Sequence, residues 1–412
     1  MKLNNVHLTY CLNIHSGETW DDNIKAIRTY STQVKQCISQ NQPFGLGLRL
    51  SSLAADTLTD SARLDEVKAE LFSLGMYAFT VNAFPHGRFH DTRIKEKVYQ
   101  PDWSHAERLA YTNKTAHILA TLLPDGMDGS ISTVPVGYKS EAKTEAQLQT
   151  SAANLAEAAV YLARLNDSTG RTVRLALEPE PDCIIEDAES LVSYFQESLL
   201  RSGIIWLKSK HGIGKSQAEQ ILRSYIGACV DTCHFDVVFK DPLEAYRKIH
   251  CAGFCIPKVQ LSSAISYTDK ALAMQSFRHL IDGVYLHQTR IKRKDGTIVR
   301  LHDLEDNRQT EEQLTELEEA RIHYHVPLYE FECHGITPTL GYTNNGFLKA
   351  AAENTCHFEI ETYTAPFLKE AIGTDIVNSI VKEYKTVIEL HQDKTADTVD
   401  KRIADHGINI YS

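Results

Sequence analysis

The sequence predicts a (β/α)8 barrel, the α/β fold in which eight parallel strands alternate with eight helices. Short apolar runs alternate with helix-like segments almost throughout the chain, which is typical of parallel strands joined by crossover helices. The 412 residues are enough for one large TIM barrel with insertions, and no Gly-, Ser- or Pro-rich linker divides them. We therefore predict a single barrel domain over residues 1–412, with insertions at about 198–225 and 265–356.

Nine apolar runs are candidates for strands. Five or six strand–helix units would build an open doubly wound sheet, whereas nine candidates favour a barrel with one additional strand in the later insertion. That insertion includes a long charged stretch, residues 287–314, which contains an Asp-Gly turn. The nine candidates cover residues 5–14, 44–50, 76–84, 129–138, 172–179, 227–231, 257–264, 324–331 and 357–364.

Hydrophobic periodicity predicts helices between these runs. In residues 60–75, leucine and valine recur at intervals of three and four from Leu64 to Leu74, and Gly75 is suited to end the helix. Residues 145–167 are rich in Ala and Leu and predict a second, longer helix.

One phosphate-binding motif fails on inspection. Gly214, Lys215 and Ser216 match the end of a phosphate loop, but the motif requires a glycine where the chain has Ser209. No apolar strand directly precedes this segment either. We therefore expect the start of a helix here and no nucleotide cofactor.

Composition restricts the partners and the compartment. The net charge of −11 argues against a surface for nucleic acid. The first 20 residues lack the apolar core of a secretory signal, and no apolar run approaches the roughly 18 residues that span a bilayer. We therefore expect a cytoplasmic protein without direct membrane insertion. Nine scattered cysteines fit a reducing compartment. We interpret the C-x3-C pairs at 229–233 and 251–255 as small buried side chains rather than as a zinc site.

Two acidic residues stand where apolar strands end. Glu178 ends the run at 172–179 and Asp231 ends the run at 227–231. Active sites of such barrels lie at the C-terminal ends of the strands, so both side chains are expected at one rim. Either acid alone is more simply a helix cap or an ion-pair partner. The two together indicate a functional site.

The last two barrel strands add further polar groups. Alternation places Lys258 and Gln260 on the inner face of one strand, and His357, Glu359 and Glu361 on the inner face of the other. A hydrogen-bonded core pair is the plainer explanation for the first two. Clustered carboxylates repel one another unless a cation or a proton lies between them. One divalent ion, Mg²⁺ or Mn²⁺, or Zn²⁺, Co²⁺ or Fe²⁺ if imidazoles take part, would be bound by Glu178, Asp231, Gln260 and Glu361.

Eighteen histidines include several at strand ends. Each one alone is more often a core or surface imidazole than a ligand. We predict that five basic side chains bind the substrate: His15, His86, His234, Lys258 and His325.

The order of these motifs is similar to that of the xylose isomerase-like barrel superfamily, which comprises sugar isomerases and epimerases and also endonuclease-IV-type enzymes. The motifs are a strand-terminal Glu178, the Asp-x-x-His of Asp231 and His234, a strand with Gln260, and Glu361 followed by Tyr363. The segments LTYCLNIHSGETW, VDTCH, KVQLSSA, HVPLYE and EIETYT further resemble the EboE-like metabolite traffic proteins, up to about residue 365.

This resemblance implies a metal-dependent barrel with the four ligands named above. Glu178 and Glu361 would also be the catalytic groups that move a proton between adjacent carbons, and His234 would contact substrate oxygens. His325 could replace Gln260 as a ligand, and Glu359 could compete with Glu361.

The function that we expect is metal-dependent isomerisation or epimerisation of a small hydroxy-carbonyl metabolite, in a biosynthesis or traffic pathway whose other proteins are the expected partners. A non-enzymatic carrier or scaffold is the first alternative. A metal-dependent hydrolase of the endonuclease IV type is the second, and the acidic chain disfavours it.

Overall fold

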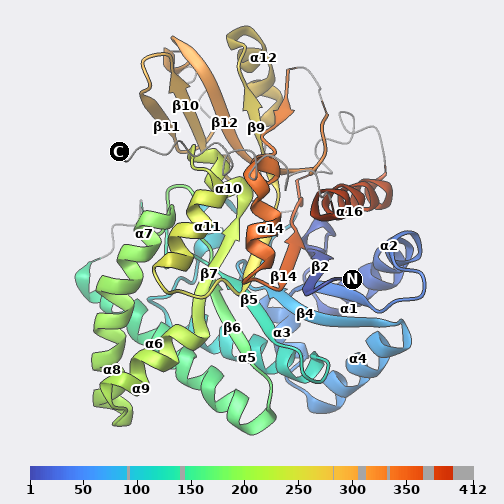
Figure 1. Ribbon diagram of the computed structural model, residues 1–412, viewed down its shortest axis with the longest axis vertical. Helices are drawn as coiled ribbons and strands as arrows, with labels where there is room; N and C mark the ends of the chain where they lie inside the picture. The colour runs from blue at the N-terminus through green and yellow to red at the C-terminus, as the bar shows by residue number, and fades with distance from the viewer. Residues whose placement is uncertain are drawn as a thin grey trace, which may run out of the picture.

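The chain folds into a TIM barrel with a second, smaller sheet above one end (Figure 1). The structure is a computed structural model. Helices lie on the outside of the barrel strands. The structure describes residues 1–90, 93–139, 144–281, 283–304, 312–331, 335–364 and 375–392.

Eight parallel strands form the barrel, in the order in which the chain reaches them except that the last strand pairs with the first. A parallel bridge between Cys11 and Gly47 joins the first two strands and completes the circle. The short strand β1, Lys2–Leu3, pairs antiparallel with β2. The barrel strands are β2 Val6–Tyr10, β3 Phe44–Arg49, β4 Met76–Asn82, β5 Gly129–Thr133, β6 Val173–Leu177, β7 Ile226–Asp231, β8 Lys258–Leu261 and β14 His357–Ile360.

Helices cover the outer face of the barrel because the outward side chains of the strands are aliphatic. Among the described residues, no helix is both long and apolar enough to cross a membrane. The helices are α1 Trp20–Ala26, α2 Thr32–Ile38, α3 Ser52–Thr57, α4 Ser61–Ser73, α5 Ala106–Leu122, α6 Glu145–Thr169, α7 Ala188–Ser193, α8 Arg201–His211, α9 Lys215–Tyr225, α10 Thr232–Val237, α11 Pro242–Cys251, α12 Lys270–Leu280, α14 Phe347–Ala352 and α16 Ile376–Gln392.

The second sheet interrupts the barrel between β8 and β14. Its strands are antiparallel, pair in the order β11-β10-β12-β9-β13, and have an apolar cluster of their own. Figure 1 shows this sheet at the end of the barrel where α10 begins. The strands are β9 Ser263–Tyr267, β10 Thr289–Arg293, β11 Ile298–Leu301, β12 Leu317–Val326 and β13 Thr337–Pro338.

Two arginines, one of them buried, connect the second sheet to the barrel. Arg290 on β10 is 1% exposed and forms ion pairs with Asp182 at 2.6 Å and with Glu186 at 2.8 Å, both in the loop after β6. Arg321 on β12 donates to the backbone oxygen of Asp236 at the end of α10. The sheet therefore lies over the C-terminal ends of the barrel strands.

Eight of the nine predicted strands correspond to the barrel strands. The ninth, 324–331, was expected to be one additional strand, but it overlaps only the end of β12 in a sheet of five strands. The charged stretch 287–314 contains the β10–β11 hairpin, and its residues 305–311 lie outside the described part of the chain. The predicted helix at 60–75 is α4, and Gly75 follows it with a φ of 65°. The region 198–225 is mainly helical, and α9 begins at Lys215.

The barrel interior is polar below the rim. The Lys258 ammonium lies 2.6 Å from Glu359, and both side chains are fully buried. Burial alone would lower the pKa of Lys258, but the Glu359 carboxylate raises it above its ordinary value. A side chain at Gly47 would place its Cβ 2.2 Å from the Glu359 carboxylate, so the glycine makes room for this pair.

A buried glutamate fixes α16 against the barrel. Glu383 is fully buried, and its carboxyl group accepts hydrogen bonds from the backbone N of Leu328 and from the Thr362 hydroxyl. Burial raises the pKa of Glu383 to about 8. The folded protein therefore retains a proton on this group at pH values where the unfolded chain has lost it.

Stability is expected to fall as pH rises through this window. Because the pKa of Glu383 is raised on folding, its contribution is complete below about pH 4.5 and decreases by about 1.4 kcal/mol per pH unit until about pH 8. Glu383→Gln should remove this part of the slope, as measured by urea unfolding between pH 5 and 8. Glu389→Gln, an exposed change on the same helix, is the control and should keep the wild-type slope. An unchanged slope in Glu383→Gln would contradict this assignment.

Candidate metal centre

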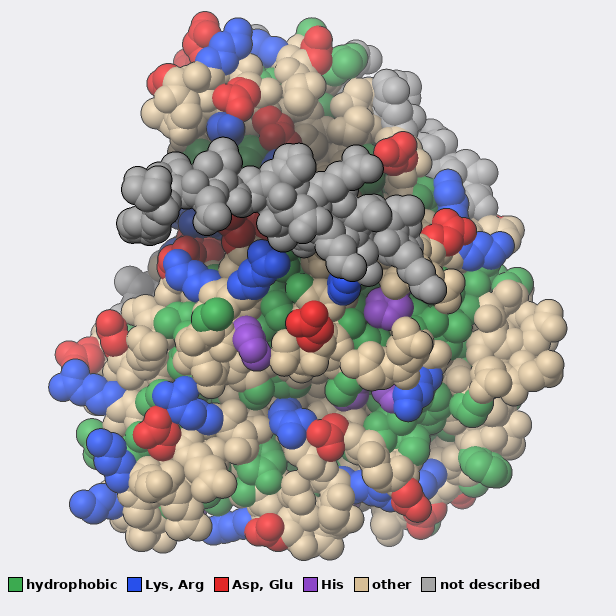
Figure 2. All heavy atoms as spheres, viewed as in Figure 1, with side chains coloured by type: hydrophobic (Ala, Val, Ile, Leu, Met, Phe, Trp, Pro, Cys, Tyr) green, Lys and Arg blue, Asp and Glu red, His purple; other side chains and the backbone are tan. Residues whose placement is uncertain are grey.

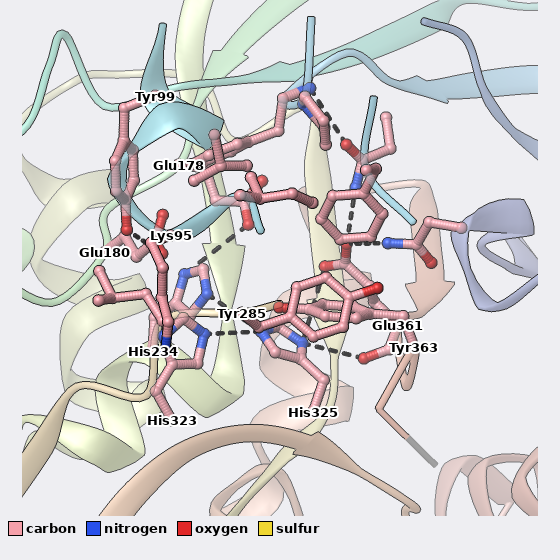
Figure 3. Close-up of a pocket in the computed structure, with 18 residues that line it drawn as sticks. Lys95, Tyr99, Glu178, Glu180, His234, Tyr285, His323, His325, Glu361 and Tyr363 are labelled. Carbon is pink, nitrogen blue, oxygen red and sulfur yellow. Dashed lines mark hydrogen bonds and ion pairs between the residues drawn. The ribbon is translucent and has the colours of Figure 1, made fainter. Parts of the chain in front are cut away.

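A cavity of about 50 Å³ lies at the C-terminal ends of the barrel strands, beneath the second sheet (Figure 3). Its size suits a few waters, an ion or part of a small molecule. Carboxylates, imidazoles and aromatic rings line it. The labelled residues of the lining are Lys95, Tyr99, Glu178, Glu180, His234, Tyr285, His323, His325, Glu361 and Tyr363.

Three carboxylates from different strands meet here, and two of them, Glu178 and Glu361, line the cavity. Glu178 directly follows β6, Asp231 is the last residue of β7, and Glu361 directly follows β14. Backbone hydrogen bonds from Glu178 N to Thr133 O and from Glu361 N to Leu261 O extend the barrel ladder by one residue and fix these positions. One oxygen of each acid lies within 4.8 Å of the others, and all three residues are buried.

Asp231 has two different oxygens. Its Oδ1 accepts hydrogen bonds from Cys233 N and from the Ser262 hydroxyl, both at 2.8 Å, and the first of these caps α10. Its Oδ2 is buried and has no hydrogen-bond partner among the described residues. The helix cap thus fixes the carboxylate and leaves its second oxygen without a hydrogen bond beside the other two acids.

Glu361 is fixed by three side-chain amides. Its Oε1 accepts hydrogen bonds from Asn13 at 2.8 Å and from Asn82 at 2.6 Å, and its Oε2 accepts one from Gln260 at 2.5 Å. Glu178 is held less tightly: its Oε1 lies 3.7 Å from the His234 ring, and its buried Oε2 has no partner among the described residues.

The three acids differ in their affinity for protons. Burial, together with the charge of Asp231, raises the pKa of Glu178 well above its ordinary value. Burial, with the charges of Glu178 and Asp231, does the same to the pKa of Glu361. Burial opposes the ionisation of Asp231 too, but His234 and His325 outweigh it and lower the pKa of this carboxyl. Without a cation, burial and mutual repulsion therefore favour the protonated forms of the two glutamates.

The donor set fits a divalent cation. Three convergent carboxylates in a buried site are repulsive when ionised, and two of their oxygens, Glu178 Oε2 and Asp231 Oδ2, have no partner in the described structure. A doubly charged ion would offset the repulsion and bind the two unpartnered oxygens. Mg²⁺ and Mn²⁺ prefer oxygen ligands, and binding of either ion would displace the protons from the carboxyl groups into solvent.

Three imidazoles lie beside the acids. His234 comes from α10, and His323 and His325 come from β12 of the second sheet. The Nε2 of His325 lies 3.2 Å from that of His234 and 3.0 Å from that of His323. Glu180, two residues beyond Glu178, joins this group with a ligand oxygen within 4.8 Å of His234 and His323.

The structure brings some of the predicted residues together and separates others. Glu178, Asp231, Glu361, His234 and His325 meet at the cavity or at its edge. Gln260 also reaches the cluster, but its amide nitrogen faces Glu361 while its Oε1 accepts a hydrogen bond from the Cys229 thiol at 2.6 Å. As a metal ligand, Gln260 therefore stays a prediction.

Three predicted substrate-binding residues lie elsewhere and are not part of the described cavity lining. His15 is buried, bonded to the Tyr10 hydroxyl at 3.0 Å and stacked on Tyr30. His86 is half-buried and packs edge-on against Tyr111. Lys258 lies lower in the barrel, where it pairs with Glu359.

Glu180, Asn13 and Asn82 are site residues that were not predicted from the sequence. A signal for Glu180 was present, because in the run Glu-Pro-Glu it shares the alternation that places Glu178 at the rim. Asn82 ends β4, and Asn13 lies in the short 3-10 turn Leu12–Ile14 after β2. Polar amides at two further strand ends were therefore a usable signal.

The opposite end of the barrel has a larger hollow of about 950 Å³. It lies at the N-terminal ends of the strands, near Met76 and His357. Among the described residues, none of the groups of potential metal ligands is located there. The groups of potential metal ligands in the described residues thus lie at the C-terminal ends of the strands, where active sites of such barrels are found.

The fold is similar to that of a solved TIM-barrel protein described as xylose isomerase-like. A xylose isomerase-like TIM barrel protein from Mycobacterium smegmatis in complex with magnesium is similar to this chain, with 11% identity over 95% of this chain and 98% of that one, at a TM-score of 0.52. At this identity the likeness shows the fold alone.

Two further solved structures are similar at lower scores. A structure of L-ribulose 3-epimerase has 13% identity over 98% of this chain and 100% of that one, and an IolI protein with a zinc atom has 11% identity over 94% and 98%, each at a TM-score of 0.48. No protein-family model matches the chain, and no curated protein matches it in sequence. The narrower resemblance to EboE-like proteins is not supported by these comparisons.

Proposed function

We propose that the protein is a divalent-metal-dependent isomerase or epimerase that acts on a small hydroxy-carbonyl metabolite. The observation that carries this proposal is the convergence of three acids, Glu178, Asp231 and Glu361, from three strands, and two of these acids, Glu178 and Glu361, line one cavity. A role for the metabolite in a traffic or biosynthesis pathway, with partners from that pathway, belongs to the same proposal and depends on the EboE-like motifs alone.

Glu178, Asp231 and Glu361 would bind the ion. When bound, it would supply a Lewis acid that polarises a carbonyl group and makes the neighbouring C–H more acidic. His325 is the alternative to Gln260 as a further ligand, although its Nδ1, 3.8 Å from Asp231 Oδ2, already donates to Glu361 O.

We assign the proton transfers to Glu178 and Glu361, which reach the cavity from different strands. β7 and β8 separate β6 from β14, so the two carboxylates reach the cavity from different parts of the rim. Inversion at a carbon requires that a proton leaves one face and another arrives at the opposite face. The amides of Asn13 and Asn82 orient Glu361, whereas Glu178 has one oxygen without a partner in the described structure.

The upper wall of the cavity limits the substrate to a small molecule. Phe89, Tyr285 and Tyr363 pack together with ring centroids 5.1 to 5.3 Å apart. Such a wall excludes water from a reacting carbonyl group. On the face shown in Figure 2, acidic and basic side chains are interspersed, which gives no single-sign surface for a polyanion on that side.

Metal content tests the first part of this proposal. The purified protein, dialysed against Mn²⁺, should retain the ion, and Asp231→Asn should lower its affinity at least tenfold because an unpaired ligand oxygen and its charge are lost. Equilibrium dialysis with elemental analysis measures the change. Glu383→Gln, which removes a buried carboxyl group outside the cavity, should bind as the wild type does.

Turnover separates an enzyme from a carrier. In ²H₂O, an isomerase or epimerase incorporates deuterium at the carbon beside the carbonyl group of its substrate, whereas a carrier binds its ligand without exchange. A screen of aldoses, ketoses and aromatic carbonyl compounds by NMR would detect this. Saturable binding with no exchange for any ligand would contradict the enzymatic proposal.

A further inference from the structure

The three imidazoles at the cavity edge all present the same type of nitrogen to one another. His234 Nδ1 lies 2.8 Å from the backbone oxygen of Pro179, and His325 Nδ1 lies 3.0 Å from that of Glu361. A carbonyl oxygen can only accept, so both Nδ1 atoms carry hydrogen. In neutral rings the two Nε2 atoms therefore carry lone pairs and no hydrogen.

His323 has the same tautomer, which is fixed through the side chain of Gln288. Its Nδ1 lies 2.6 Å from Gln288 Oε1. The amide nitrogen of Gln288 donates to the Pro181 backbone oxygen and to the Tyr99 hydroxyl, which fixes the orientation of the amide. The Oε1 of Gln288 must then accept a hydrogen bond from His323 Nδ1, so the Nε2 of His323 also carries a lone pair.

Lone pairs at these distances repel one another unless a cation binds them. His325 Nε2 is 3.2 Å from His234 Nε2 and 3.0 Å from His323 Nε2, and no ring has a hydrogen left to donate on this side. A backbone or amide carbonyl behind each Nδ1–H is the arrangement that orients metal-binding histidines. Figure 3 shows the three rings gathered on one side of the cavity.

Glu180 gives a second, independent observation. This carboxylate is 6% exposed and lines the cavity. Its Oε1 accepts a hydrogen bond from Tyr99 at 2.7 Å, whereas its buried Oε2 has no partner among the described residues. One oxygen of Glu180 lies within 4.8 Å of a ring nitrogen of His234 and of His323, and its Oε1 is 3.8 Å from His323 Nδ1.

We infer that His234, His323, His325 and Glu180 form a second metal site, separate from the three-carboxylate site and suited to Zn²⁺. Three imidazoles and one carboxylate are a zinc donor set, whereas three carboxylates favour Mg²⁺ or Mn²⁺. Asp231 lies between the sites, because one of its oxygens is also within 4.8 Å of a ring nitrogen of His234 and of His325. Two of the four ligands come from the second sheet, which gives this sheet a chemical role.

The test uses Zn²⁺ alone and counts ions on the full chain. Equilibrium dialysis should give two zinc ions per wild-type chain, one for His323→Gln and one for Glu361→Gln. His357→Gln is the matched control, since His357 is equally buried but is bonded to Ser130 below the rim. With Co²⁺ as the probe, the strong visible absorption of a tetrahedral nitrogen-rich site should disappear in His323→Gln and persist in Glu361→Gln.

The outcomes separate this inference from the proposed function. A wild type that binds one ion, lost in Glu361→Gln and kept in His323→Gln, overturns the second site and leaves the proposed enzyme intact. One ion lost only in His323→Gln supports the second site and removes the carboxylate site. One ion lost in both variants means a single shared site and overturns the inference.

NMR of the wild type keeps the inference testable if a variant does not fold. Addition of Zn²⁺ should shift the Nε2 resonances of the three rings while their Nδ1–H signals persist. A His325 ring that carries hydrogen on both nitrogens, unchanged by Zn²⁺, would show that a proton links the cluster and would overturn the site.

Discussion

Glu361→Gln is expected to lower solvent-deuterium exchange into the substrate by about 10³-fold, the largest effect on activity that the site predicts. The glutamine keeps the shape of the side chain and its contact with Asn13 and Asn82, but it cannot take a proton or carry a charge. Exchange measured by NMR in ²H₂O, on whichever carbonyl compound the wild type turns over, gives the ratio directly.

Metal content distinguishes two reasons for this loss. If Glu361 acts mainly as the base, saturating Mn²⁺ should restore ion binding in Glu361→Gln without restoring exchange. Glu361→Asp, which retains a shorter carboxylate, should recover part of the rate. Glu383→Gln serves as the control and should exchange at the wild-type rate. Full activity in Glu361→Gln would remove Glu361 from the mechanism.

Lys258→Met is expected to destabilise the folded protein by about 3–5 kcal/mol, because it leaves the fully buried Glu359 carboxylate without its cation. The double variant Lys258→Met with Glu359→Leu should regain much of this loss, since neither charge is then buried alone. Urea unfolding at constant pH measures both free energies.

A surface pair gives the comparison for this prediction. Lys292 and Glu318 lie at the same 2.6 Å separation, but their side chains are 36% and 44% exposed. Lys292→Met should change the free energy of unfolding by less than about 1 kcal/mol. Equal effects at the two pairs would mean that burial of the Lys258–Glu359 pair does not determine its contribution.

The barrel was predictable from the sequence because of what a closed parallel sheet requires. Its strands are short apolar runs whose outer faces meet helices, so runs such as 172–179 and 227–231 stand out. Their terminal acids were visible for the same reason: Glu178 and Asp231 are costly to bury unless they have a common partner.

The histidines show where such reasoning stops. His15 and His325 both stand near strand ends, and nothing in their local sequence separates them. What separates them is a non-local event: β12 pairs with β9 and brings His323 and His325 over the rim, while His15 stacks on Tyr30. Strands of the second sheet are short or charged, so their number was not evident from apolar runs.

Gln260 shows a second limit, at the level of single atoms. Alternation places its side chain on the inner face, and the structure has it there. Which end of the amide faces the acids depends on the Cys229 thiol and on Glu361, residues that come from two other parts of the chain. A pattern along one strand contains no information about that choice.

The pairing of β14 with β2 has a consequence for how the protein is made. Asn13 donates to Glu361 across a sequence separation of 348 residues, and His323 and His325 also come late in the chain. During synthesis the ribosome must therefore release nearly the whole polypeptide before the first strand finds its neighbour and any ligand set is complete. Nascent chains shorter than about 360 residues would expose the edge of β2, which makes them natural clients for chaperones.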